Sequence, residues 1–205
     1  MKNLLFLVGS CLLSGCSVIG IHNAEEATHS VLYENGNIQI RQYDALLIAQ
    51  TEVTGDYKES GNTAFKRLAG YIFGDNQSQQ KIDMTVPVVE ANQNEKIAMT
   101  VPVYQQAEAD KWTMTFVLPS QYTLDTIPEP LDETIDIKQI PPRKVATIRY
   151  TGYIRPQKIR TKATELQTWL DENGYKAIAA PYSAAYDPPW TIPFFRRNEV
   201  HIEIE

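Results

Sequence analysis

The spacing of apolar residues changes several times along the chain, and each change predicts a different element of secondary structure. Apolar residues at every second position predict half-buried strands, and apolar residues three or four positions apart predict amphipathic helices. The two-residue period predicts strands at 37–43, 46–54, 112–118, 134–140, 144–153 and 198–204, with an extended segment at 181–189.

Two segments have the helical period. The first begins near Tyr57 and ends before Gly74, and the second follows Pro156 and ends before Gly174, since glycine is common just past a helix end. Their apolar faces consist of Phe65, Leu68, Ala69 and Ile72 in the first helix and of Ile159, Ala163, Leu166 and Leu170 in the second. The order strands, helix, strands therefore occurs twice, which predicts an α+β fold made of two similar halves.

An octapeptide also occurs twice, as KIDMTVPV at 81–88 and as KIAMTVPV at 96–103. In both copies the apolar side chains fall on one parity, so antiparallel pairing sets residues of the same face against each other. The register that places Ile82 opposite Val103 leaves Asn92 and Gln93 as a two-residue turn, which predicts a β-hairpin. Its apolar face serves either as ordinary core or as a surface for an apolar ligand.

Composition is that of a folded domain rather than a disordered chain. The 205 residues are 43% hydrophobic and 21% charged, which suits one globular domain with a substantial core. The net charge of −6 offers no broad positive surface, so binding to nucleic acid is not expected.

The first residues have the features of a bacterial lipoprotein leader. Lys2 is followed by an apolar run at 4–13 that is too short to span a membrane, and LSGC at 13–16 resembles a lipobox. This resemblance implies a signal peptide at 1–15, a lipid anchor on Cys16, a tether at 16–30 and a folded domain at 31–205. Ser17 after the cysteine favours the outer membrane, on its periplasmic side. The alternative is an ordinary secretory signal in which Cys16 is coincidental.

Removal of the leader and acylation of Cys16 would leave the folded domain without a free thiol, because Cys11 and Cys16 are the two cysteines of the chain. Cysteine catalysis and cysteine-ligated metal sites are therefore not expected. No other metal site is expected either.

Several separate segments resemble the SOUL haem-binding protein family. They are the two octapeptides, GNTAFKRLAGYIFG at 61–74, YDPPWTIPFFRRNEV at 186–200, NIQIRQY at 37–43 and FVLPSQYTLDTIPEPLDETIDI at 116–137. The resemblance implies a pseudo-duplicated, antiparallel, distorted β-barrel of about eight strands with two flanking helices, related to GyrI-like effector-binding domains. It also implies non-covalent binding of b-type haem or a related tetrapyrrole in an apolar surface groove beside a helix, with basic side chains near the propionates.

The resemblance, together with the positions of cations and methionines, indicates candidate ligand-binding residues. Lys66 and Arg67 on the first helix and Lys158 on the second are expected to meet the propionates. Met84 and Met99 lie on the apolar faces of the octapeptides, either as core filler or as part of the ligand surface. Gln42 stands where some family members carry the proposed axial histidine, so binding without a histidine ligand is expected.

The histidines of this chain are not expected to bind iron. His22 lies in the tether and His29 just before the first strand, where solvated side chains are usual. His201 is expected to point outward, because the apolar residues of its strand have the other parity. The aromatic residues Trp190 and Phe194 either form the wall of a planar ligand site or cover the barrel.

Glu199 has two interpretations. It forms a structural ion pair with Arg196 or Arg197, or it is a pocket carboxylate for cationic ligands, as in the related effector-binding domains. No nucleophile–base pair is recognisable, so an enzyme is not expected. We expect a membrane-anchored, monomeric tetrapyrrole-binding protein of the cell envelope. The alternatives are a binding protein for another hydrophobic molecule or an envelope protein, and a hydrolase or dechelatase that uses Glu199.

Overall fold

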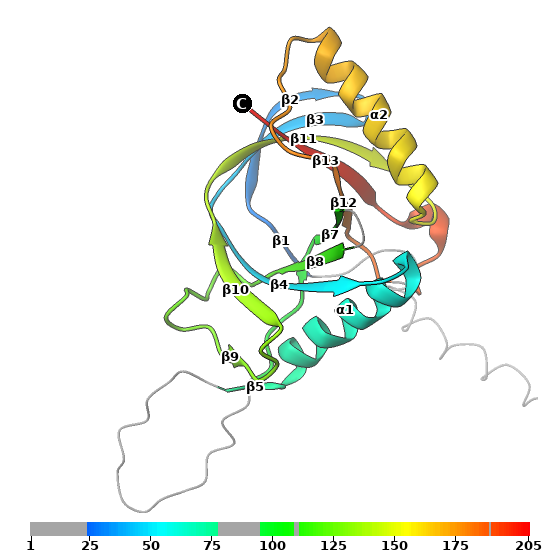
Figure 1. Ribbon diagram of the computed structural model, residues 1–205. Coiled ribbons are helices and arrows are strands. Elements are labelled where there is room, and N and C mark those ends of the chain that lie inside the picture. The colour runs from blue at the N-terminus through cyan, green and yellow to red at the C-terminus, as the bar shows by residue number, and fades with distance from the viewer. Residues whose placement is uncertain (1–23, 78–94, 109–110, 189) are drawn as a thin grey trace, which may run out of the picture.

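The computed structural model describes residues 24–77, 95–108, 111–188 and 190–205 (Figure 1). Its main feature is a nine-stranded sheet that curls around its own interior and carries both helices on the outside (Figure 1). In sheet order the strands are β10 (Ile135–Ile140), β4 (Leu46–Thr54), β8 (Lys111–Val117), β7 (Val103–Glu108), β12 (Tyr182–Ala185), β13 (Asn198–Ile204), β11 (Arg143–Tyr150), β3 (Ile38–Tyr43) and β2 (His29–Asn35). All neighbouring pairs are antiparallel, and within the described chain the edge strands β10 and β2 do not pair with each other.

The sheet order is symmetrical about the contact between β7 and β12. The first half of the chain contributes β3, β4, the helix α1 (Tyr57–Phe73), β7 and β8, and the second contributes β10, β11, the helix α2 (Pro156–Glu172), β12 and β13. Within the halves, β4 pairs with β8 and β11 pairs with β13. The first strand of each half pairs across to the other half, β3 with β11 and β10 with β4. The two halves are therefore interlocked. The predicted pseudo-duplicated α+β fold is confirmed. The sheet differs in detail, because it is open and curled and has nine strands, where a distorted barrel of about eight was expected.

Alternation of side chains gives the sheet two different faces. On β3, Ile38 and Ile40 face outward into the core beneath α2, whereas Arg41 and Tyr43 face the interior of the curled sheet. A third core cluster fills this interior, and its larger side chains are Tyr43, Leu46, Ile48, Tyr104, Val117, Val145 and Tyr186. The convex face of the sheet is thus apolar under the helices, and the concave face is a mixture of aromatic, apolar and charged residues.

The helix α1 forms because its first turn is capped and its inner face is apolar. The Oδ1 atom of Asp56 accepts hydrogen bonds from the backbone N–H groups of Lys58 (2.9 Å) and Glu59 (3.1 Å). At the other end Gly74 adopts a φ of 127°, a conformation that glycine allows at low cost. Leu68 and Tyr71 are fully buried in the core between α1 and strands β4 and β8.

The helix α2 has a different N-terminus. Pro156 occupies its first turn, where the missing N–H costs nothing, and the preceding Arg155 makes no side-chain capping bond. Leu166 and Leu170 are fully buried against strands β11 and β13. Both helices have the boundaries that the sequence predicts.

Residues before the first long strand belong to the fold. The short strand β1 (Glu25–Glu26) pairs in parallel with β6 (Thr100–Val101), and the N–H group of Ala27 donates to the carbonyl of Val101 (2.9 Å). The tether expected at 16–30 therefore overlaps structured residues, since β2 also begins at His29. In Figure 1 this N-terminal segment passes over the interior of the curled sheet.

The remaining elements are short. β5 (Asn76–Gln77) pairs with β9 (Glu129–Pro130), and a single 3₁₀ turn covers Pro193–Phe195. The first octapeptide lies outside the described residues, and the predicted hairpin with it. None of the described helices is both long enough and apolar enough to cross a membrane.

The difference between the two helix N-termini is testable. Asp56→Ala removes the side chain that accepts two backbone N–H groups, so the free energy of unfolding is expected to fall by about 1 kcal/mol. Arg155→Ala is the matched control, because this cap residue makes no side-chain capping bond, and its expected loss is below about 0.5 kcal/mol. Urea unfolding followed by circular dichroism measures both. Equal losses would contradict the capping role.

Candidate functional site

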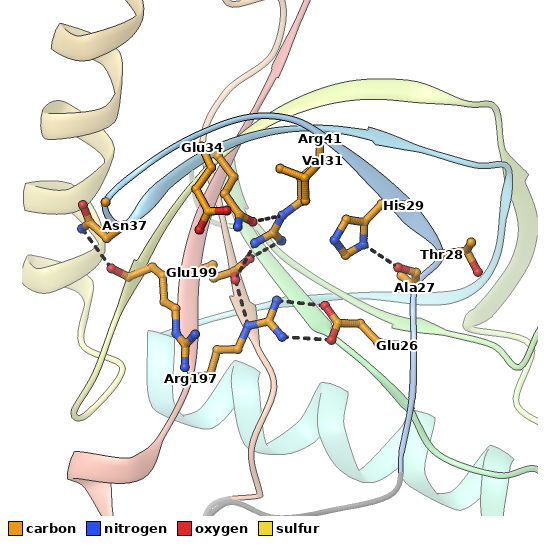
Figure 2. Close-up of a pocket in the computed structure, with 13 residues that line it drawn as sticks. Glu26, Ala27, Thr28, His29, Val31, Glu34, Asn37, Arg41, Arg197 and Glu199 are labelled. Carbon is orange, nitrogen blue, oxygen red and sulfur yellow. Dashed lines mark hydrogen bonds and ion pairs between the residues drawn. The ribbon is translucent and has the colours of Figure 1, made fainter.

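The concave face of the sheet contains a cleft of about 610 Å³ between the N-terminal segment and strands β2, β3, β11 and β13 (Figure 2). Residues 26–29 form one wall of the cleft. Its ionisable residues, apart from His29, are Glu26, Glu34, Arg41, Arg149, Arg197 and Glu199. The cleft is therefore polar and carries charges of both signs.

Glu199 lies at the floor of this cleft and has no exposure to solvent. Its Oε1 atom accepts hydrogen bonds from Nη2 of Arg41 (3.0 Å) and Nε of Arg197 (2.9 Å). Its Oε2 atom accepts from Nη1 of Arg41 (2.7 Å) and from the hydroxyl of Tyr186 (2.9 Å). It also lies 2.8 Å from Nε2 of His201. A buried carboxylate needs such partners, because an unpaired charge in the interior is costly.

Arg197 links this buried carboxylate to the surface. While its Nε binds Glu199, its two Nη atoms bind the two carboxylate oxygens of Glu26 at 2.9 and 2.8 Å, a bidentate contact (Figure 2). Its guanidinium also lies 3.7 Å from the centre of the Tyr186 ring. Two of these three contacts, with Glu199 and Tyr186, fix the orientation of Arg197 without any help from Glu26.

His201 is wholly buried on the same side of the sheet, so the expectation that it points outward is wrong. Its strand is buried on both faces, although its apolar residues have one parity, because α2 covers one face and the curled sheet itself encloses the other. Facing an ionised carboxylate, Nε2 must carry the proton and donate it, which leaves Nδ1 as an acceptor. That Nδ1 atom has no hydrogen-bond partner among the described residues.

His29 is not the solvated residue expected either. Its Nδ1 lies 2.9 Å from the carbonyl oxygen of Ala27, and its ring centre lies 4.9 Å from that of Tyr43. The histidine is thus part of the cleft wall.

The environment shifts the pKa values of both buried groups. Burial alone would raise the pKa of Glu199, but hydrogen bonds from His201 and Arg41 and the charge of Arg41 outweigh it and hold this pKa well below its usual value. Burial lowers the pKa of His201, and the charges of Arg41 and Arg143 act in the same direction, against the attraction of Glu199. Glu199 therefore stays ionised and His201 stays neutral near pH 7.

This arrangement favours a fixed charge over proton transfer. A general acid or base needs a pKa near the working pH and access to the reacting atom, and Glu199 has neither. The described residues contain no group of three or more histidine, cysteine, aspartate or glutamate side chains that could hold a metal ion. The charged groups of the cleft therefore suit ionic contacts rather than acid–base chemistry.

A second feature lies at the start of α2 and in the loop before β13. Here Tyr153, Trp190, Phe194 and Phe195 are all more than half exposed, and Phe194 reaches 82%. We call these four residues the aromatic surface. The loop is attached to the helix start, because the N–H group of Gly152 donates to the carbonyl of Pro193 (2.9 Å).

Cations surround the aromatic surface. The guanidinium carbons of Arg155 and Arg196 each lie 5.3 Å from the centre of the Tyr153 ring. Lys158 is exposed in the first turn of α2, and within the described chain neither it nor Arg155 pairs with an acid. Large exposed aromatic residues beside cations make this part of the surface a candidate for binding.

The structure places the basic candidates of the two helices in different surroundings. Lys66 is exposed on α1. Arg67 is half-buried, and its guanidinium lies near the hydroxyl of Thr51 (3.5 Å), the carbonyl of Glu52 (3.4 Å) and Asp132 (4.0 Å). Arg67 lines a separate hollow of about 330 Å³. Lys158 is exposed in the first turn of α2, five residues after Tyr153.

The remaining candidates are dispersed. Met99 is partly exposed just before β6. Gln42 lies on the convex parity of β3, opposite to that of Arg41, and donates to the carbonyl of Tyr43 (3.2 Å). Met84 and Cys16 lie outside the described residues.

Sequence reasoning missed Arg41 as the main partner of Glu199. A signal was present in NIQIRQY, where the isoleucines mark one face of the strand and leave Gln39, Arg41 and Tyr43 together on the other. Their charge and hydroxyl groups indicate a polar interior face. Pairing of Arg41 with a residue 158 positions away required the sheet order itself.

The buried pair predicts how stability depends on pH. In the folded protein the pKa of His201 lies below its ordinary value of 6.5, so the unfolded chain takes up this proton more readily. Stability is therefore expected to fall as pH drops below about 6.5, by up to about 1.4 kcal/mol per pH unit for one proton. The carboxylate of Glu199 adds a further loss only below its unfolded pKa, about 4.5.

The variant His201→Gln keeps an amide donor toward Glu199 but cannot titrate. Its free energy of unfolding is expected to change less between pH 7 and pH 5 than that of the unmodified protein, as measured by urea unfolding at each pH. The same slope in both proteins would show that His201 does not carry this dependence.

Comparisons with known proteins agree with the fold and identify relatives. The family described as "SOUL heme-binding protein" matches residues 24–203. Heme-binding protein 1 of Xenopus tropicalis is 30% identical over 164 residues, which cover 78% of this chain and 80% of that protein. Heme-binding protein 1 of Xenopus laevis is 27% identical over 164 residues, with the same coverage.

Solved structures share the fold at low identity. The C-terminal domain of EcmrR has a TM-score of 0.54 and 12% identity, covering 85% of this chain and 98% of that one. A hydrolase from Listeria innocua has a TM-score of 0.55 and 6% identity, covering 85% and 94%. At these identities the likeness concerns the fold alone. Because the family match spans nearly all of the described domain, the chain belongs to the SOUL haem-binding protein family.

Proposed function

We propose that the protein binds haem or a related tetrapyrrole on the aromatic surface, through apolar contact and ion pairs to the propionates, without a histidine bond to the iron. The observation that carries the proposal is the exposure of Tyr153, Trp190, Phe194 and Phe195 close to Arg155, which pairs with no acid among the described residues. Flat aromatic side chains suit a planar macrocycle, and burial under it would remove a large apolar area from water.

The cations around the aromatic surface suit the two propionates. Arg155 and Lys158 belong to the first turn of α2 or precede it, and no acid neutralises either within the described residues. Positive charge at a helix N-terminus opposes the helix dipole, so an anion placed there would relieve this repulsion. When bound, haem iron would supply ligand and redox chemistry, and these residues would only hold and orient the ring.

Histidine ligation is not part of the proposal. His201 is sealed inside the sheet and bound to Glu199, and His29 belongs to the cleft wall. Both therefore belong to the concave side of the sheet and are already engaged there.

Haemin titration of residues 17–205 tests the proposal. We expect a shift of the Soret band that saturates near one equivalent, and an affinity for metal-free protoporphyrin within a few-fold of that for haemin, since the iron would contribute no protein bond. A featureless, non-saturating titration would contradict binding. A strong preference for the iron-containing ring would contradict the absence of an axial ligand.

Substitution of the surface aromatics tests the location. Phe194→Ala combined with Phe195→Ala is expected to weaken haemin binding by about tenfold or more, because each ring contributes stacking and apolar area. Phe73→Ala is the matched control, since Phe73 is 62% exposed at the end of α1, and it should leave the affinity unchanged. Equal effects of the two changes would exclude the aromatic surface.

We also infer that the domain is held at the outer membrane, on its periplasmic side, by acylation of Cys16. The lipobox-like LSGC sequence supports this inference. Cys16→Ser is expected to move the protein from the membrane fraction to the soluble fraction of the envelope and to abolish labelling with a palmitate analogue. Retention in the membrane with no label in the unmodified protein would contradict it.

A further inference from the structure

The concave cleft is separate from the aromatic surface. On β13, Glu199 faces the cleft, whereas the neighbouring Val200 faces α2. The cleft and the aromatic surface share no residue, so the arginines of the cleft have no part in the proposed tetrapyrrole binding.

The two Nη atoms of Arg197, which we call its fork, are already positioned to bind a carboxylate. Its Nε atom is tied to the buried Glu199, and its ring contact with Tyr186 at 3.7 Å holds the plane of the guanidinium. The two Nη atoms therefore face the cleft in a fixed position. Bidentate binding by a planar guanidinium is the geometry that recognises carboxylates.

The group that fills this fork belongs to the chain itself. Both oxygens of Glu26 bind it at 2.8 and 2.9 Å, and the side chains of the pair are 24% and 36% exposed, at the cleft mouth (Figure 2). An ion pair with this exposure to water is weakly stabilising. Exchange of Glu26 for another carboxylate would thus conserve the contact.

A short strand and a few hydrogen bonds attach the segment that carries Glu26. The two residues of β1 pair with Thr100 and Val101, and the N–H group of Ala27, which is buried, donates to the carbonyl of Val101. The carbonyl of Thr28 accepts from the N–H group of Asp44 (3.2 Å), and Glu25 accepts from that of Ser120 (3.0 Å). The long strands of the main sheet do not depend on these bonds. Glu26 can therefore leave the fork while the cleft floor stays intact.

A second cation faces the same cleft. Arg149 lies opposite Glu199 in the pairing of β11 with β13, it is exposed, and no acceptor among the described residues binds its guanidinium. Arg41 and the Nε atom of Arg197 compensate the charge of Glu199. If Glu26 left, the Nη atoms of Arg197 and the guanidinium of Arg149 would both face the cleft without a bound carboxylate. Glu34 would remain as the acid at its rim.

We propose that the concave cleft is a second binding site, for small molecules that carry a carboxylate. In the absence of such a molecule, the carboxylate of Glu26 takes its place on Arg197. Arg197 supplies the fork, Arg149 supplies a further positive charge, and displacement of β1 opens the site. The proposal does not depend on tetrapyrrole binding, because it uses residues other than those of the aromatic surface.

The test is calorimetric titration of the protein with succinate, and with the neutral succinamide as the chemical control. Glu26→Gln removes the negative charge of the Glu26 side chain and is expected to bind succinate at least tenfold more tightly than the unmodified protein. Glu25→Gln is the matched control, because Glu25 accepts a hydrogen bond from the N–H of Ser120 (3.0 Å) and glutamine retains that acceptor. Adding Arg197→Gln to Glu26→Gln is expected to abolish the gain.

Two results would overturn the proposal. One is equal succinate affinity in the Glu26→Gln and Glu25→Gln proteins, and the other is equal affinity for succinate and succinamide. If Glu26→Gln lowers the unfolding temperature too far for titration, hydrogen exchange of the unmodified protein decides. Succinate should then increase exchange of the Ala27 amide, which binds Val101 when β1 is in place, and unchanged exchange at saturating succinate would reject the site.

Discussion

The arrangement of side chains inside the curled sheet depends on one carboxylate that has no contact with water. Glu199 is stable there because guanidinium, phenol and imidazole groups surround it on strands that are distant in sequence. Removal of one partner from such a buried pair costs about 3–5 kcal/mol, which is a large part of the stability of an ordinary domain. The pairing of Arg41 with Glu199 thus joins β3 to β13 across β11 and also sets the direction of Arg197.

The need to pair buried charges also distinguishes the two faces of the sheet. Because α1 and α2 cover the convex face, its core is apolar and depends on shape and volume. No helix of the described chain covers the concave face, so its charges are partly hydrated and partly satisfied by each other. The proposed tetrapyrrole binding relies on exposed aromatic rings, whereas the proposed carboxylate binding relies on the arginines of the cleft.

Local periodicity predicted most of the fold. The bounds of α1, β4 and β13 follow from spacing and from capping residues such as Gly74, which act over a few positions. The exposed aromatic loop and the basic start of α2 were also visible in the sequence. By contrast, the burial of His201 and its pairing with Glu199 depend on how the sheet curls, and a single strand with apolar residues at alternate positions does not reveal that its other face is enclosed.

The N-terminal boundary was harder to predict for a different reason. Glu25 and Glu26 carry no apolar pattern and so indicate a tether, yet one contacts the backbone of Ser120 and the other binds Arg197. Their order comes from ionic contacts with residues that lie close only in the folded chain. Such contacts leave no periodic signal in the sequence.

The exchange of first strands between the two halves affects how the domain assembles. β3 needs β11, and β10 needs β4, so neither half can complete its own sheet while it stands alone. During synthesis β3 can pair with β2, but it must wait for the ribosome to release the C-terminal half before it meets β11. We therefore expect the two halves to fold and unfold together, although each has its own helix and strands.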